Sequence, residues 1–126
     1  MAKILIVEDN NDFRDVVKNI LQKQFADLEI FQALTAEAGL GLAAREKPEV
    51  ILMDIHLPNM NGMEAAKLIQ EKVAGCKIII LTMFANEDVR KMCLGSDVEE
   101  VIGKNELYQK LIPTVKRLIN PEGEEK

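Results

Sequence analysis

Five short runs of apolar residues stand out along the chain, and segments with a different periodicity separate them. The runs are rich in β-branched side chains and contain few polar ones, which is typical of strands covered on both faces. The expected strands are residues 4–7, 28–33, 50–54, 77–81 and 101–102.

Between and after these runs, apolar residues recur at the spacing of a helix that packs along one side. Asn and Thr side chains favour helix starts, and Gly favours helix ends. Five helices are expected: one beginning near residues 10–12, one capped by Thr35, one over residues 63–73, one from Asn86 through Leu94 and closed by Gly95, and one from Asn105 to about residue 119. Pro113 lies inside the last helix and is expected to kink it or delay its start.

The alternation of strand and helix predicts an α/β domain with a parallel sheet, helices on both faces and right-handed crossovers. Five such units suggest the flavodoxin-like (βα)5 fold with strand order 2-1-3-4-5. We expect residues 1–119 to form this domain. The polar residues 120–126 are interpreted as a flexible tail or the start of a linker.

Composition narrows the classes of function. The chain has 126 residues, is 48% hydrophobic and carries a net charge of −5, which suits one domain with a sizeable core. It has no basic run, so we expect no direct binding of nucleic acid by this segment. Cys76 and Cys93 are its only cysteines, which argues against a zinc site and fits a reducing compartment. The apolar start is too short for a signal peptide or a membrane span, so a cytoplasmic location is expected.

Acidic residues terminate two of the expected strands. Glu8 and Asp9 follow the first strand, and Asp54 closes the third. Because the carboxyl ends of parallel strands meet at one edge, these carboxylates should lie together and repel one another unless a cation or a proton intervenes. Thr82 and Lys104 follow the fourth and fifth strands at the same edge. Oxygen ligands suit Mg²⁺, and a carboxylate can act as the nucleophile in phosphoryl transfer.

Each of these residues has an ordinary explanation when it is taken alone. Glu8 and Asp9 could form a solvated turn, Thr82 could be a strand residue, and Lys104 could be a surface lysine. Their joint placement at strand ends favours a functional site over those explanations.

This set of residues resembles the receiver domain of two-component response regulators. The resemblance runs from Lys3 to about Leu118, and a looser one points to receivers that precede helix-turn-helix output domains. The matching segments are Ile-Leu-Ile-Val-Glu-Asp-Asn at 4–10, Met-Asp-Ile-His-Leu-Pro-Asn-Met-Asn-Gly at 53–62, Leu-Thr-Met at 81–83, and Lys104.

The resemblance implies a metal site for Mg²⁺. Asp9 matches the direct metal ligand, and Asp54 is expected to share the ion. Glu8 matches an acid that contacts the metal through water. His56 is expected to offer its backbone carbonyl, not its ring.

The resemblance also implies that Asp54 is the phosphoacceptor, that the Thr82 hydroxyl hydrogen-bonds the phosphoryl group and that Lys104 pairs with it. The donor would be a histidine kinase or a phosphotransfer protein, and the receiver would control a transcriptional output domain or a separate partner. Such a domain is not a conventional enzyme, because it catalyses only its own phosphorylation and slow dephosphorylation. Activation could produce a dimer, which the sequence leaves open.

The chain departs from the family pattern near the fifth strand. Val101 stands where an aromatic switch residue is usual, and residues 95–101 form a segment about two residues longer than usual. We therefore expect any conformational switch to depend on the loop after Thr82 and on the following helix.

Two other functions stay open at this point. The altered segment before Lys104 motivates a receiver-like binding module that works without phosphate. A phosphatase with an aspartate nucleophile ranks last, because such enzymes usually place a second aspartate two residues on, where this chain has His56.

Overall fold

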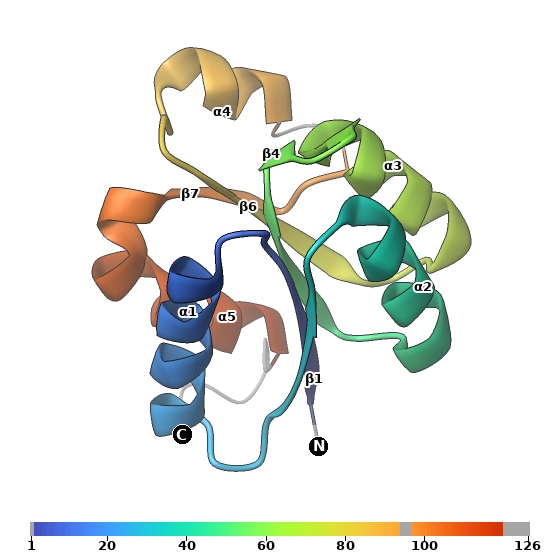
Figure 1. The fold of residues 1–126 in the computed structure, drawn as a ribbon. Helices are drawn as coiled ribbons and strands as arrows, with labels where there is room; N and C mark the ends of the chain where they lie inside the picture. The colour runs from blue at the N-terminus through green and yellow to red at the C-terminus, as the bar shows by residue number, and fades with distance from the viewer. Residues whose placement is uncertain (1, 94–96, 120–126) are drawn as a thin grey trace.

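The structure is a computed structural model that describes residues 2–93 and 97–119, and it is built on a five-stranded parallel sheet (Figure 1). The strand order is β2-β1-β3-β6-β7, which is the predicted order 2-1-3-4-5 of the five main strands. The strands are β1 (Lys3–Val7), β2 (Glu29–Ala33), β3 (Val50–Asp54), β6 (Lys77–Thr82) and β7 (Glu100–Gly103). Every boundary lies within one residue of its prediction, so the flavodoxin-like α/β fold is confirmed.

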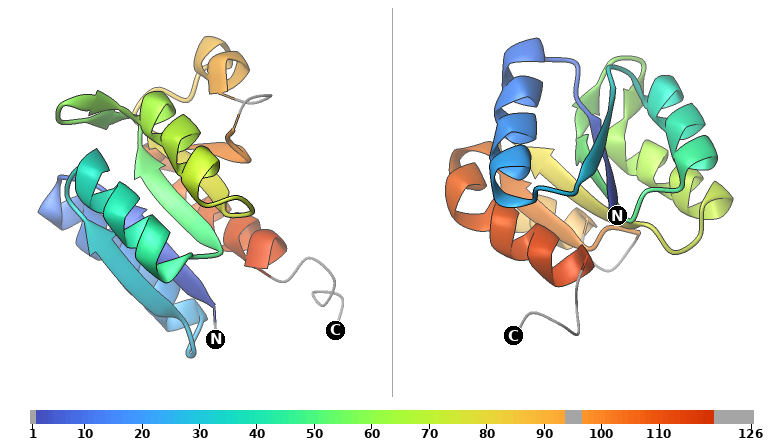
Figure 2. Two further views of the ribbon diagram at one scale, coloured as in Figure 1. Left: turned by 90° about the vertical axis from the view of Figure 1, so that its right-hand side faces the viewer. Right: turned by 90° about the horizontal axis from the view of Figure 1, so that it is seen from below.

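Helices cover both faces of the sheet (Figures 1 and 2). They are α1 (Asn11–Gln24), α2 (Ala36–Glu46), α3 (Gly62–Lys72), α4 (Glu87–Cys93) and α5 (Leu107–Ile119). Helices α1 and α5 pack on one face, and α2, α3 and α4 lie on the other. Among the described residues, none of the helices has the length and apolar character needed to cross a bilayer.

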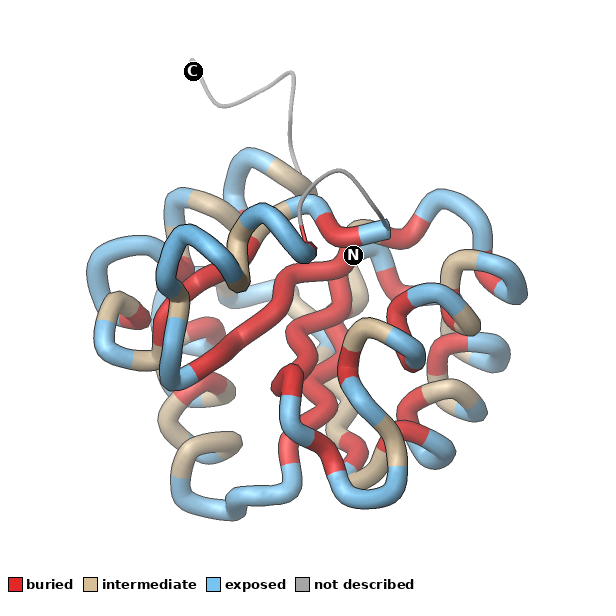
Figure 3. Tube along the Cα trace, turned by 90° about the horizontal axis from the view of Figure 1, so that it is seen from above, coloured by how far each residue is buried: buried red, intermediate tan, exposed pale blue. Residues whose placement is uncertain are grey.

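The central strand β3 is buried along its whole length (Figure 3). Successive side chains of a strand point to opposite faces. Ile51 and Met53 accordingly join the core under α2, α3 and α4, whereas Val50 and Leu52 join the core under α1 and α5. A continuous apolar run therefore supplies side chains to both cores. This explains why these strands lack the alternation of apolar and polar residues that is seen in a half-exposed sheet.

Side-chain caps begin three of the helices where the sequence predicts them. The oxygen Oδ1 of Asn10 accepts a hydrogen bond from the backbone N–H of Phe13, and Thr35 Oγ1 accepts from Ala38. Asn86 caps α4 in the same way. The predicted end of that helix, at residues 94–95, lies outside the described residues.

Residues 55–61 lie between an expected strand and an expected helix, and no regular structure was expected there. They contain a short antiparallel hairpin, β4 (His56–Leu57) and β5 (Met60–Asn61). Asn59 sits at its tip with φ 67°. Asn is one of the few residues that adopts this left-handed conformation readily, so one asparagine turns the chain within four residues.

The start of the last helix also differs from its prediction. Residues 104–106 form a 3₁₀ turn in which the Glu106 carboxylate accepts a hydrogen bond from the Gly103 N–H, and α5 begins only at Leu107. Pro113 does not delay this start, because α5 runs through it to Ile119. Pro113 lies on the exposed side of α5, where a carbonyl that lacks its helical partner can bind water.

Candidate functional site

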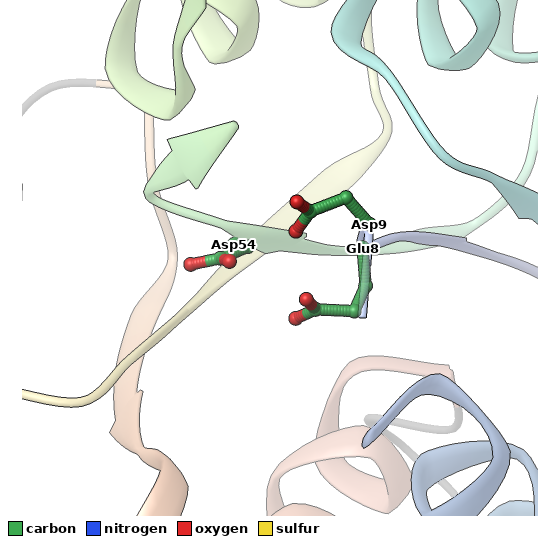
Figure 4. A group of neighbouring side chains, drawn as sticks. All are labelled: Glu8, Asp9 and Asp54. Atoms are coloured by element: carbon green, nitrogen blue, oxygen red, sulfur yellow. The ribbon is translucent and has the colours of Figure 1, made fainter. Parts of the chain in front are cut away.

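The three predicted acids meet at the carboxyl edge of the sheet. Strands β1 and β3 are paired in parallel, so Glu8 and Asp9 leave β1 next to the end of β3, where Asp54 lies (Figure 4). One carboxylate oxygen from each residue lies within 4.8 Å of the other two. Glu8 and Asp54 are buried, whereas Asp9 is exposed. The sequence prediction of an acidic cluster is therefore confirmed.

The backbone around Asp54 is fixed by the segment that follows it. The Ile55 N–H donates to the Leu81 carbonyl of β6, and the Gly62 N–H donates to the Ile55 carbonyl at 2.8 Å. The His56 N–H donates to Asp54 Oδ1 at 3.2 Å. These bonds orient the carboxylate before any ligand arrives, because they define both the chain direction and the side-chain rotamer.

Lys104 reaches this cluster from the turn that follows the edge strand β7. Its Nζ lies 3.0 Å from Glu8 Oε1 and 3.5 Å from Asp54 Oδ2. The same ammonium group lies 4.4 Å from the centroid of the Phe13 ring. The lysine therefore bridges two acids that would otherwise repel each other.

Burial dominates the electrostatics of Glu8. Loss of solvent raises the pKa of this carboxyl, and the nearby Asp54 charge raises it further. The Asn10 N–H, which donates to Glu8 Oε2 at 3.0 Å, and the Lys104 ammonium oppose this shift. The ionised form of Glu8 thus depends on its cationic and N–H partners.

Thr82 ends β6, directly after the residue that pairs with Asp54. It is buried, and its Oγ1 accepts a hydrogen bond from the Phe84 N–H at 3.2 Å. The side chains of His56 and Phe84 are exposed, the latter with 67% of its surface accessible. The roles assigned to the Thr82 hydroxyl and to the His56 carbonyl stay predictions.

Two residues of the site were not singled out from the sequence. Phe13 packs against the core under α1 and α5, and its ring also contacts Lys104. Arg14 donates from Nη1 to the Glu8 carbonyl at 2.8 Å and from Nε to Gln32 at 3.2 Å, which joins α1 to the ends of β1 and β2. No local spacing signals such contacts, because the partners come from separate elements.

The donor set fits a hard divalent cation. Three carboxylates offer oxygen atoms close enough to share one ion, and two or three such ligands plus water satisfy Mg²⁺. Among the described residues, no other group of acidic, histidine or cysteine side chains comes together in this way.

Arg90 of α4 reaches the strand that carries Val101. Val101 is fully buried, and its carbonyl accepts from Arg90 Nη1 at 2.8 Å. The same guanidinium donates to the Ala85 carbonyl at 3.3 Å and to Glu106 at 3.2 Å. One side chain thus ties α4 to the loop after Thr82, to β7 and to the turn that carries Lys104.

The Arg90→Met variant is expected to loosen α4 with only a small effect on global stability. A methionine keeps much of the apolar stem but removes three hydrogen bonds, each contributing about 1 kcal/mol. We expect amide hydrogen exchange across residues 87–93 to accelerate about tenfold, while the β3 amides keep their protection. Unchanged exchange in α4 would contradict the idea that Arg90 holds this helix. Lys91→Met, on the exposed side of the same helix, is the matched control.

Comparison with known proteins agrees with this geometry. The family model described as "Response regulator receiver domain" matches residues 4–116. The chain is 39% identical to the transcriptional regulatory protein YdfI and 35% identical to LiaR, both of Bacillus subtilis (strain 168), over 70% of its length in each case. It spans only 40% and 42% of the lengths of these two relatives.

Solved structures show the same fold. The response regulator domain of Thermotoga maritima CheB superimposes with a TM-score of 0.84 at 26% identity, covering 95% of this chain and 97% of that one. A CheY-like receiver domain protein of Methanospirillum hungatei JF-1 gives 0.86 at 28% identity, covering 100% and 99%. The Mn(2+)-bound form of response regulator Rcp1 gives 0.78 at 22% identity, covering 94% of each chain, and shows the fold alone. With its acids gathered at the sheet edge and the family model matching most of its length, this chain belongs to the response regulator receiver domains.

Proposed function

We propose that this domain is a phosphorylation-controlled switch in which Asp54 accepts a phosphoryl group from a phosphohistidine. A histidine kinase or a phosphotransfer protein would supply that group. One observation carries the proposal: Asp54 lies within reach of two further acids and of the Lys104 ammonium at the carboxyl edge of the sheet, and Thr82 at that same edge is the one other buried polar side chain among the described residues. Both relatives named above are transcriptional regulatory proteins, which supports a transcriptional output.

The chemistry is a displacement at phosphorus. An Asp54 carboxylate oxygen forms the new O–P bond while the N–P bond of phosphohistidine breaks. The bonding electrons leave on the imidazole nitrogen, which takes a proton from solvent. Lys104 then pairs with the phosphoryl oxygens, and the Thr82 hydroxyl donates to one of them, since its oxygen only accepts in the bond from the Phe84 N–H.

Asp9 and Asp54 would hold the metal ion directly, the His56 carbonyl would add a ligand, and Glu8 would act through water. A bound Mg²⁺ would neutralise the charge on the phosphoryl oxygens and reduce repulsion between the acids. We infer magnesium from the all-oxygen donor set.

The expected energy of switching is comparable to the energy required. A phosphoryl group adds about −1.5 to −2 charges, and hydrogen bonds to charged groups contribute ~1.5–3 kcal/mol each. Two such bonds give about 3–6 kcal/mol before ordering costs, whereas moving a population from 1:99 to 99:1 takes ~5.5 kcal/mol. A partner that selects the phosphorylated form would complete the shift. With no aromatic ring at Val101, the movement would pass through the loop after Thr82 and through α4.

Phosphorylation can be tested without knowing the kinase. The protein is incubated with phosphoramidate, with Mg²⁺ or with EDTA, and its intact mass is followed. We expect one phosphoryl adduct that requires Mg²⁺ and is absent from Asp54→Asn. Asp97→Asn, an exposed acid remote in sequence from the cluster, should form the adduct at the wild-type rate.

A second candidate is a binding module that works without phosphate. Val101 and the longer segment before β7 favour it, because the usual aromatic readout is missing. Complete absence of an adduct under all conditions would support this candidate. Rapid turnover of unrelated phosphate esters would instead support a phosphatase.

A further inference from the structure

We propose that Phe13 is a positioning residue for Lys104, and that its ring face holds the ammonium group beside Asp54. The inference rests on the proposed function, because it assumes that Lys104 pairs with a phosphoryl group on Asp54. The 4.4 Å between Nζ and the ring centroid is well inside the ~6 Å over which a cation is attracted to an aromatic face.

The three neighbours of Lys104 differ in how they respond to the reaction. Glu8 and Asp54 attract the ammonium through charge, so their attraction changes when a cation binds between the acids or when Asp54 is phosphorylated. The ring carries no net charge, and its attraction stays constant through both events. Phe13 therefore provides a fixed contact while the ion pairs around Lys104 rearrange.

Glu8 competes with Asp54 for the ammonium group of Lys104. It is 1% exposed and held by the Asn10 N–H, and it lies closer to Lys104 than Asp54 does, at 3.0 Å against 3.5 Å. Charge alone would draw the lysine toward β1 and away from the phosphorylation site. The ring of Phe13 gives the ammonium group a further contact beside the two acids, without adding another negative charge that would compete with the phosphoryl group.

The ring is itself well fixed. Phe13 lies in the first turn of α1, where its N–H donates to Asn10 Oδ1 at 2.8 Å, and its side chain packs against the core under α1 and α5. The neighbouring Arg14 anchors the same turn to the Glu8 carbonyl. Lys104 has only 15% of its side chain exposed, and partial desolvation strengthens a cation–π contact.

A merely structural role for Phe13 makes a different prediction. Packing depends on the volume of the side chain, whereas a cation–π contact depends on the electron density of the ring face. Fluorine atoms on the ring reduce that density with little change in volume. Phe13 is therefore replaced by mono-, di- and trifluorophenylalanine in the full chain, with Phe13→Tyr and Phe13→Leu as aromatic and aliphatic comparisons.

Two readouts are measured on every variant. The first is the NMR shift of the Lys104 side-chain protons, which an overlying ring displaces. The second is the rate constant for adduct formation with phosphoramidate and Mg²⁺. We expect the rate constant to fall stepwise with fluorination, by about two- to fivefold in total. Phe13→Tyr should stay near the wild-type rate, and Phe13→Leu should resemble the trifluoro protein.

The same series in a Lys104→Met background separates the contact from packing. With no cation over the ring, fluorination should leave the rate constant unchanged. Equal effects in both backgrounds, or a flat series with unchanged Lys104 shifts in the wild-type background, would overturn the proposal. If the wild-type protein forms no adduct, the proposed function fails. The NMR shifts of the Lys104 side-chain protons then still test whether the ring contacts Lys104. Shifts that change stepwise with fluorination support the contact, and shifts that stay constant across the series overturn it.

Discussion

Gly62→Ala is expected to destabilise the protein by about 3 kcal/mol, because a Cβ atom at this position meets backbone on two sides. It would lie 2.6 Å from the Asp54 carbonyl oxygen and 2.7 Å from the Ile55 Cα. Neither atom belongs to a side chain that can rotate away. The methyl group can fit only if the end of β3 and the residue after it move, and Asp54 lies at that end.

The free energy of unfolding is measured by urea denaturation followed by circular dichroism. Gly41→Ala is the matched control, because a Cβ there meets nothing within 4 Å and the residue lies inside α2. Alanine is the better helix former, so this control should gain about 0.5–1 kcal/mol. A Gly62→Ala protein within 0.5 kcal/mol of wild type would show that the close approach does not constrain the backbone at Asp54.

Lys104→Met is expected to cost about 2 kcal/mol at pH 7 in metal-free buffer. The substitution leaves Glu8, which is 1% exposed, without the ammonium 3.0 Å away. Breaking a fully buried ion pair costs ~3–5 kcal/mol, and the smaller value reflects the partial exposure of the lysine and the water that can enter the pocket.

The loss of stability in Lys104→Met should depend on pH, and the direction of this dependence follows from the pKa of Glu8. Burial raises the pKa of Glu8, while Lys104 lowers it. Without the lysine, the folded-state pKa rises further above the ordinary value of 4.5. When the pKa of a carboxyl is higher in the folded than in the unfolded protein, the protonated form stabilises the fold. This stabilisation is fully present below pH 4.5, the ordinary pKa of the group, and is lost as the pH rises through the folded-state pKa. The difference between variant and wild type should therefore be largest at neutral pH and shrink toward pH 4.5.

Two further variants serve as comparisons for this experiment. Lys110→Met removes another lysine that pairs with a carboxylate, at 3.1 Å from Glu106, but its side chain is 49% exposed. It should cost at most about 0.5 kcal/mol at every pH. The double variant Glu8→Gln, Lys104→Met removes the buried charge and should recover most of the loss. A deficit in Lys104→Met that does not vary with pH would rule out an uncompensated Glu8 charge as its cause.

Much of the site could be predicted because the sequence shows where the buried strands end. A carboxylate after a buried apolar run must lie at one edge of a parallel sheet, and this placed Glu8, Asp9 and Asp54 together. The hairpin over residues 56–61 was missed because its strands are too short to show a period. Its left-handed Asn59 is set by the turn it closes and not by a pattern of apolar positions.

The contacts around Lys104 and Arg90 lay beyond sequence reasoning for a different reason. Phe13 and Lys104 belong to opposite ends of the chain, and both have ordinary interpretations as a core residue and a surface residue. Arg90 likewise looks like a solvated helix residue until β7 and the turn after it are placed beside α4. Long side chains reach partners that depend on how elements pack, and no spacing along the chain records that packing.

By itself, the sequence determined the sheet, its strand order and the acids at its carboxyl edge, because apolar runs and helical spacings are local patterns that few topologies can satisfy. Only the tertiary structure decided the ring that contacts Lys104, the distance of this lysine from each acid, and the carbonyls that Arg90 joins. The physical reason is that burial and distance set the strength of these interactions, and both arise only when separate elements come together.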